Sequence, residues 1–427
     1  MFPNPQDVVA LPDRATVEQY EQLATDLVHA CASKTPGAYR RWAAQWPEQA
    51  DQIKRFAIET LARGVCARTA AQFVIARVHG FDSWPTFAAH LDGLASAASP
   101  ASHFETAAEA IVCGDAAALT ALLREHPELI RARSTRVHRA MLLHYVAANG
   151  VENYRQTTPA NIVEITEMLL DAGAEIDAEA DMYGGRCTTL GLAATSIHPE
   201  LAGVQNALMQ TLIDRGAAVD RRLAAGRSDS LVEACFANGR SAAAEYLGAH
   251  GARLNLDGAA GIGRLDLVRA FFNHDGTLRP PATLEQLRAG MNWACEHGRT
   301  EVARFLLDRC GLASAPPPED GRTYLHSAAV GGRAAIVQLL LEHGASVQAV
   351  ERTYDGTPLQ WALHGWSNAR SDAARDPYYE VVARLVRAGA AVNHAWLDDA
   401  DEETSFRRAL RADPRMRAAL AGRWTTA

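Results

Sequence analysis

The stretch DGRTYLHSAAVGGRAAIVQLLLEHGASV, residues 320–347, contains two apolar segments separated by a pair of glycines. The first segment ends in the small residues Ala328 and Ala329, and the second ends in leucines before Gly344. Apolar residues that recur every three to four positions are typical of an amphipathic helix, and a glycine after the last of them is a common helix end. The stretch therefore predicts a helix, a turn, a second helix and a second turn.

The same pattern recurs along the chain at a nearly constant interval. The turn glycines are 34 residues apart between Gly298 and Gly332, and 35 residues apart between Gly263 and Gly298. Such a period indicates an array of repeats, each of which buries its apolar face only by stacking on its neighbours. Three further stretches carry the pattern: AMLLHYVAANG (140–150), AGMNWACEHGRTEVARFLLDRCG (289–311) and GTPLQWALHGW (356–366).

The segment 320–329, DGRTYLHSAA, closely resembles the signature of the ankyrin-repeat family, whose period is about 33 residues. The resemblance implies an all-α solenoid of about eight helix pairs with short β-hairpin fingers. The second helices of these pairs are expected to end at 121–127, 169–174, 212–217, 246–252, 271–276, 306–311, 340–345 and 385–390.

The first 95 residues do not follow the repeat, although helical periodicity runs through them. The stretch 69–91 resembles the helical segment that precedes ankyrin repeats in a group of bacterial proteins, and we expect Phe81, Trp84 and Phe87 to pack in a small core. The predicted domains are a helical domain (1–95), a linker (96–103), the repeats (104–398) and a helical C-terminal cap (399–427).

Composition excludes several classes of protein. The chain of 427 residues has a formal net charge of −8, so it lacks the cationic surface that nucleic acid requires. It has no run of 18 apolar residues, which argues against a membrane protein, and no secretory signal pattern, which predicts a cytoplasmic location. The excess of arginine over lysine suggests a GC-rich bacterial genome.

The seven cysteines stand singly, without a C-x-x-C pair. This spacing argues against a disulfide framework and against a thiolate zinc site. We therefore expect all seven to be buried apolar residues in a reducing compartment, and we expect neither a metal nor a cofactor.

Three units are longer than the repeat, by about 10 residues or more. In each unit the extra residues fall between the two helices, at 151–162, 196–207 and 367–379. Insertions of this kind usually lie on one face, which is often the binding face. Neutral drift is the alternative, because doubling a loop costs only about 0.6 kcal/mol.

The resemblance also implies which residues face the concave groove. In the family the signature histidine bonds within and between repeats, so His144 and His326 are expected to be scaffold, with Asn292 and Gln360 as replacements. In the family, the residue after the signature histidine and the two residues before the turn glycine face the groove. Those positions hold Tyr145, Asn149, Trp293, Glu296, His297, Trp361 and His364.

Large aromatic residues at exposed positions are typical of binding hot spots. Trp366 occupies the glycine position of its repeat, and we favour its packing under the 367–379 insertion over contact with a ligand. The finger DMYGGR, residues 181–186, either presents Asp181, Tyr183 and Arg186 to a partner or is a plain tight turn.

No catalytic motif of the common hydrolase, protease or nucleotide-binding types occurs, and GAAGIG at 258–263 falls where a repeat helix is expected. The sequence therefore predicts a module that binds a protein or peptide. The alternative is a bacterial tailoring or hydrolytic enzyme that acts on a small molecule or modified peptide, with Tyr183, Glu296, His297 and His364 as its acid–base residues.

Overall fold

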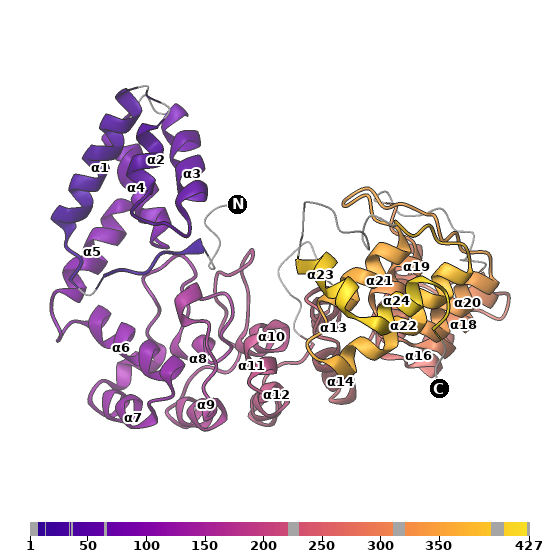
Figure 1. The fold of residues 1–427 in the computed structure, drawn as a ribbon. Coiled ribbons are helices and arrows are strands. Elements are labelled where there is room, and N and C mark those ends of the chain that lie inside the picture. The colour runs from indigo at the N-terminus through magenta and orange to yellow at the C-terminus, as the bar shows by residue number, and fades with distance from the viewer. Residues whose placement is uncertain are drawn as a thin grey trace. The chain divides into compact units, whose positions relative to one another are not determined.

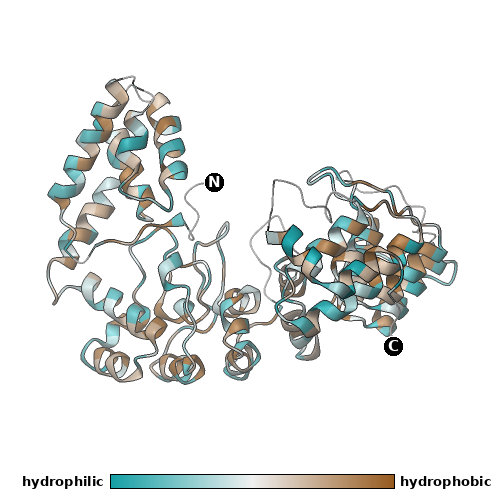
Figure 2. Cartoon of the chain, viewed as in Figure 1, coloured by the Kyte–Doolittle hydropathy of each residue, from teal (hydrophilic) through white to brown (hydrophobic). Residues whose placement is uncertain are grey.

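The computed structural model describes residues 7–424, apart from 13, 34, 36, 64–65, 221–229, 311–320 and 394–404. Asp320 of the repeat signature and the predicted 398–399 domain boundary lie outside this part. The chain forms two compact units, 1–252 and 253–427. The described residues are mostly helical, as predicted, and hydrophilic and hydrophobic residues share the same helices (Figures 1 and 2). In the described part, no helix combines the length and apolarity that crossing a bilayer requires.

The first five helices pack around one core before the repeats begin. They are α1 (Val17–Ala32), α2 (Ala38–Ala43), α3 (Ala50–Arg63), α4 (Arg68–Val78) and α5 (Trp84–Leu94). Phe81 and Phe87 are fully buried in this core and Trp84 packs at its edge, as predicted. The Thr16 capping box begins α1 and the Ser83 side chain caps α5, which satisfies N–H groups at both helix starts.

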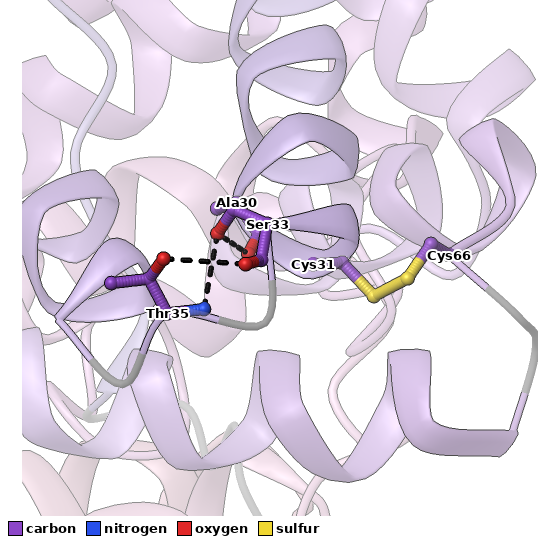
Figure 3. The surroundings of a disulfide bond; sticks show 5 residues. All are labelled: Ala30, Cys31, Ser33, Thr35 and Cys66. Carbon is purple, nitrogen blue, oxygen red and sulfur yellow. Dashed lines mark hydrogen bonds between the residues drawn. A yellow bond between two sulfur atoms is a disulfide. The ribbon is translucent and has the colours of Figure 1, made fainter.

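A disulfide joins Cys31, at the end of α1, to Cys66, just before α4 (Figure 3). The expectation that all seven cysteines are single buried residues is wrong for this pair. The two residues are 35 positions apart in sequence, but packing of α1 beside α4 brings their Cα atoms within 5.6 Å. Cys113 is exposed, which also departs from the expectation, whereas Cys235 and Cys295 are buried.

In the described residues, eight helix pairs follow, and each pair consists of a first helix and a second helix. In the first unit they are α6 (Pro100–Cys113) with α7 (Ala116–Glu125), α8 (Leu142–Tyr145) with α9 (Ile162–Asp171), α10 (Thr189–Thr195) with α12 (Gln205–Asp214), and α13 (Leu231–Ala237) with α14 (Ser241–Ala249). In the second unit they are α15 (Leu256–Ile262) with α16 (Leu265–Ala270), α17 (Leu284–His297) with α18 (Thr300–Cys310), α19 (Tyr324–Val330) with α20 (Ala334–Glu342), and α21 (Pro358–Ser367) with α22 (Asp372–Arg387).

The positions of these pairs confirm the repeat pattern read from the sequence. The stretch 258–263 lies in α15 and its terminal Gly263, so it is a repeat helix and not a phosphate loop. In the described residues the fingers form only isolated β-bridges, which pair Ala180 with Cys187 and Phe272 with Leu278. Two helices, α23 (Ser405–Ala412) and α24 (Pro414–Leu420), follow the last pair, and α24 packs on α22.

The three insertions take three different forms. The first contains a short 3-10 helix, Asn153–Arg155, and the second contains α11 (His198–Leu201). The third does not form a loop throughout, because α22 begins at Asp372, capped by Ser371. Most of the 367–379 insertion therefore lengthens the second helix of its repeat.

A buried ionic network joins the N-terminal helices to the first repeats. Arg136 lies in the finger before α8, its guanidinium stands 5.4 Å from the Phe81 ring, and the backbone N–H of Val137 donates to Gly80. Arg136 pairs with Glu105 of α6 at 2.5 Å and with Glu152 of the first insertion at 2.9 Å. The network therefore fixes the N-terminal helices and the first insertion on the first repeats.

The charges in this network balance. Arg155 adds a second cation, 2.6 Å from Glu105. Burial alone would raise the pKa values of Glu105 and Glu152, but it is outweighed by Arg136 and Arg155 at Glu105 and by Arg136, His138 and Arg155 at Glu152, so both pKa values lie below normal. Both carboxylates are therefore ionised at neutral pH.

The first helices of the second unit approach one another closely at small residues. A Cβ added to Gly331, at the end of α19, would overlap the carbonyl oxygen of Glu296 on α17. A Cβ on Gly365 of α21 would stand 2.6 Å from the carbonyl oxygen of Val330. These contacts set the spacing of α17, α19 and α21, and hence the spacing of the side chains that project from them.

We predict that Gly331→Ala destabilises the second unit by about 1–3 kcal/mol, because the added methyl group forces α17 and α19 apart. The gain of about 0.4–1 kcal/mol from a less flexible unfolded chain is smaller. Urea unfolding measures the difference. The control is Val330→Ala, which removes atoms at the adjacent position instead of adding them. A Gly331→Ala protein that is as stable as the wild type would contradict the close packing of α17 and α19.

We also predict that Arg136→Met destabilises the first unit by about 3–5 kcal/mol, since it leaves buried carboxylates without their cation. Arg186→Met, which breaks the exposed pair with Glu179, is the matched control and should cost at most about 1 kcal/mol. Urea unfolding of both proteins at neutral pH gives the comparison, and equal stabilities would refute the network.

The lowered pKa values of Glu105 and Glu152 predict the dependence on pH. Their contribution is complete above the ordinary carboxyl pKa and is lost as pH falls through the folded-state values. Unfolding measured across acidic pH should show this loss, and Arg136→Met should shift it to higher pH, because without Arg136 the two carboxyls take up protons more readily. An unchanged acid profile in Arg136→Met counts against this account.

Candidate functional site

The first helices of the second unit align the residues predicted for the groove. Trp293 on α17 and Trp361 on α21 occupy equivalent places in their repeats, with Ser327 of α19 between them in sequence order. Both tryptophans are partly buried, whereas Ser327 is fully buried and its hydroxyl donates to Asn292. The tryptophans therefore keep part of their surface exposed.

Trp361 lies in a chain of contacts that reaches the neighbouring repeats. The Arg322 guanidinium stands 4.7 Å from its ring centroid, in a cation–π contact. Arg322 also pairs with Glu296 on α17 at 2.7 Å. The structure thus joins two predicted site residues, Glu296 and Trp361, through an arginine that the sequence analysis did not select.

The turn before α21 is built around a buried carboxylate. Glu351 is 1% exposed and accepts the backbone N–H of Thr353 at 2.7 Å and that of Tyr354 at 2.8 Å. It also accepts the N–H of Gly356 at 3.1 Å, and the indole N–H of Trp361 is a further donor. Together these bonds determine the course of the chain from 351 to 356.

Tyr354 stands at the tip of this turn with 80% of its surface exposed, beside Val350, which is also exposed. Both residues were missed in the sequence because they lie in a finger and not on a groove helix. The dipeptide Asp355-Gly356, a common turn signal, marks the site of the turn, but it does not reveal that a buried glutamate orients the tyrosine.

His297 stacks on Trp293, with ring centroids 5.9 Å apart. Burial and the charges of Arg333 and Arg299 lower the pKa of His297 to about 4. The imidazole is therefore neutral near pH 7 and lacks the second proton that an imidazolium would give as a general acid.

His364 and Trp366 have different environments on the same helix. His364 is exposed, and its ring lies 3.3 Å from the Asn368 amide nitrogen, one helical turn later. Trp366 is 1% exposed and lies beneath Arg375 of the third insertion, with the guanidinium 5.4 Å from the ring. The favoured prediction for Trp366, packing under the insertion, is confirmed.

The signature histidines are scaffold residues, as predicted. The Nδ1 of His326 accepts the N–H of Thr323 at 3.1 Å, so its Nε2 carries the proton and donates to the carbonyl of Gly356 at 3.0 Å. His144 makes the same pair of bonds, with Met141 and with Ala178.

The two residues that replace the histidine keep hydrogen bonds of their own. The side-chain oxygen of Gln360 accepts the N–H of Thr357 at 2.8 Å, which reproduces the bond within the repeat. Asn292 bonds to Ser327 of the next repeat.

The expectation that Tyr145 is exposed to the groove is wrong. The side chain is fully buried, in edge contact with Phe104 and His138 and 6.0 Å from the Arg155 guanidinium. The first insertion supplies Arg155 and the finger before α8 supplies His138, and repeat spacing reveals neither contact. Tyr145 therefore belongs to the core and has no surface to offer a partner.

The finger at 181–186 presents its tyrosine, with Tyr183 at a positive φ of 49° and 59% exposed. Its hydroxyl donates to the Asn149 side chain at 2.8 Å, and the Asn149 amide donates to the Leu192 carbonyl at 3.1 Å. Asp181 and Arg186 are exposed on the same finger. The structure thus brings together Asn149, Asp181 and Tyr183 in the first unit.

The four residues considered for acid–base chemistry have separate partners. Glu296 pairs with Arg322, His297 stacks on Trp293 and His364 bonds to Asn368, all in the second unit. Tyr183 belongs to the first unit. Within the described ranges no three His, Cys, Asp or Glu residues cluster as metal ligands would. A shallow depression of about 470 Å³ lies between α1 and α2, among residues other than those predicted for the site.

Comparison with known proteins agrees with the arrangement of helix pairs in repeats. A family model described as ankyrin repeats (3 copies) matches residues 256–351 and 291–395. The 26S proteasome non-ATPase regulatory subunit 10 of Dictyostelium discoideum is 32% identical over 84 residues, which are 20% of this chain and 36% of that protein. The chain thus spans about a third of the length of this relative. Ankyrin repeats are thus recognised over residues 256–395 of this chain.

Proposed function

We propose that the second unit binds an extended segment of a partner protein along α17, α19 and α21. Ankyrin repeats and the similarity to a proteasome regulatory subunit support a protein-binding module. Trp293 and Trp361 are the aromatic contacts on the helices, and Tyr354 is the contact on the finger. The Arg322–Glu296 pair and His364 supply polar contacts along the same helices.

The observation that carries this proposal is the exposure of Tyr354 on a hydrogen-bonded turn. A tyrosine that leaves 80% of its surface in water gains nothing from its position in the free protein. Its backbone N–H is nevertheless held by a buried carboxylate. A turn whose backbone is already ordered loses less entropy on binding, and tyrosine and tryptophan are enriched among binding hot spots.

The first unit offers a second contact for a partner. Tyr183 is exposed at the tip of its finger and is held by Asn149, and Asp181 lies beside it. We propose that these three residues form a separate contact surface within the first unit. Changing Tyr183 separately from Tyr354 would show whether one partner uses both units.

Peptides selected from a phage-displayed random library on the wild-type protein provide a probe. We predict that Tyr354→Ala or Trp293→Ala weakens binding of these peptides by roughly 30-fold, since a hot-spot side chain contributes about 2 kcal/mol or more. Ile58→Ala, which also removes an exposed apolar side chain but lies on α3, should bind like the wild type. Biolayer interferometry measures the affinities.

Melting temperatures separate loss of contact from loss of fold. The Tyr354 ring is mostly exposed, so Tyr354→Ala should leave the melting temperature unchanged. Trp361→Ala is a poorer test, because its ring contacts Arg322 and lies 5.7 Å from His326, so truncation removes packing as well. If the peptides bind Tyr354→Ala and Trp293→Ala as tightly as the wild type, the proposed site is overturned.

A further inference from the structure

The turn 351–356 contains more hydrogen-bond donors than a neutral side chain could satisfy. Three backbone N–H groups, those of Thr353, Tyr354 and Gly356, point at the Glu351 carboxylate. The indole N–H of Trp361 is a fourth donor. A carboxylate offers about four acceptor sites on two oxygens, whereas a glutamine amide replaces one oxygen with a group that can only donate.

The charge of Glu351 suits this role. Burial alone would raise the pKa of Glu351, but the N–H groups of Gly356, Thr353 and Tyr354 and the indole of Trp361 outweigh it and lower the pKa. The carboxylate is therefore ionised at neutral pH. Hydrogen bonds to an ionised acceptor are stronger than those between neutral groups.

The same turn is tied to the groove helices. The backbone N–H of Glu351 donates to the carbonyl of Gly356 at 3.1 Å, and that carbonyl also accepts from His326 of α19. Trp361, which donates to Glu351, is stacked by Arg322. The contacts therefore run without a break from the finger to the ion pair with Glu296 on α17.

We propose that Glu351 is a positioning residue that holds Tyr354 of the finger and Trp361 of the groove as one preformed recognition unit for a partner segment. Glu351 itself is buried and has almost no surface to offer a partner. It acts through the backbone of the turn and through the indole of Trp361. The binding part of this inference rests on the proposed function, whereas the positioning part is a property of the free protein.

Glu351→Gln tests the positioning part without a ligand. The amide keeps the size of the side chain but leaves at least one buried donor unsatisfied, so hydrogen exchange at the amides of Thr353, Tyr354 and Gly356 should accelerate by roughly tenfold or more. Exchange in α20 should stay as in the wild type. Unchanged exchange in the turn would overturn the inference.

A double-mutant cycle with the selected peptides tests the binding part. Glu351→Gln should weaken peptide binding by roughly tenfold, and Tyr354→Ala should add less in its presence than it does alone, since a released tyrosine has already lost part of its effect. Full additivity of the two changes would overturn the coupling of Tyr354 to Glu351.

The outcomes distinguish this inference from the proposed function. If Tyr354→Ala weakens binding and Glu351→Gln does not, the inference fails and the proposed site stands. If neither Tyr354→Ala nor Trp293→Ala weakens binding, the proposed site fails, and with it the binding part of the inference, while hydrogen exchange still decides the positioning part. Should Glu351→Gln unfold the unit, Trp361→Phe, which removes only the indole donor, takes its place in the exchange measurement.

Discussion

The close stacking of first helices is the constraint on which the rest of the second unit depends. Gly331 and Gly365 leave space for the backbone of the preceding helix, so that α17, α19 and α21 lie nearly in contact. Side chains at equivalent positions of these helices consequently repeat at a short interval. Trp293 and Trp361 share one such position, and Glu296 and His364 share another. A recognition surface made from several repeats requires this regular spacing.

The features that depend on contact between neighbouring repeats could be predicted from the sequence. The helix pairs and the scaffold roles of His144 and His326 are of this kind. Each repeat meets the same surroundings as the one before it, so a residue pattern at a fixed period records those surroundings. The places of the insertions followed from the same period, because extra residues interrupt it.

Contacts outside the repeat pattern could not be predicted in this way. Tyr145 is buried because an insertion and a finger fold over it, and the Cys31–Cys66 disulfide depends on how α1 and α4 pack. Both involve residues far apart in sequence and unrelated by any period. Glu351 and Arg322 were missed for a related reason. Their roles come from directed hydrogen bonds and ring contacts, which depend on geometry rather than on residue type.

Photo-crosslinking tests the central claim, binding of a protein segment at the second unit, most directly. A benzophenone amino acid is placed at Gln360, which is exposed and precedes Trp361, and in a second protein at Ile58 of α3, which is also exposed. Both proteins are irradiated in lysate of the cells that produce the chain. We expect a defined protein adduct at position 360 that is weak or absent at 58 and is lost when Tyr354 is changed to alanine. Equal labelling at both positions, or labelling at 360 that Tyr354→Ala leaves unchanged, would contradict it.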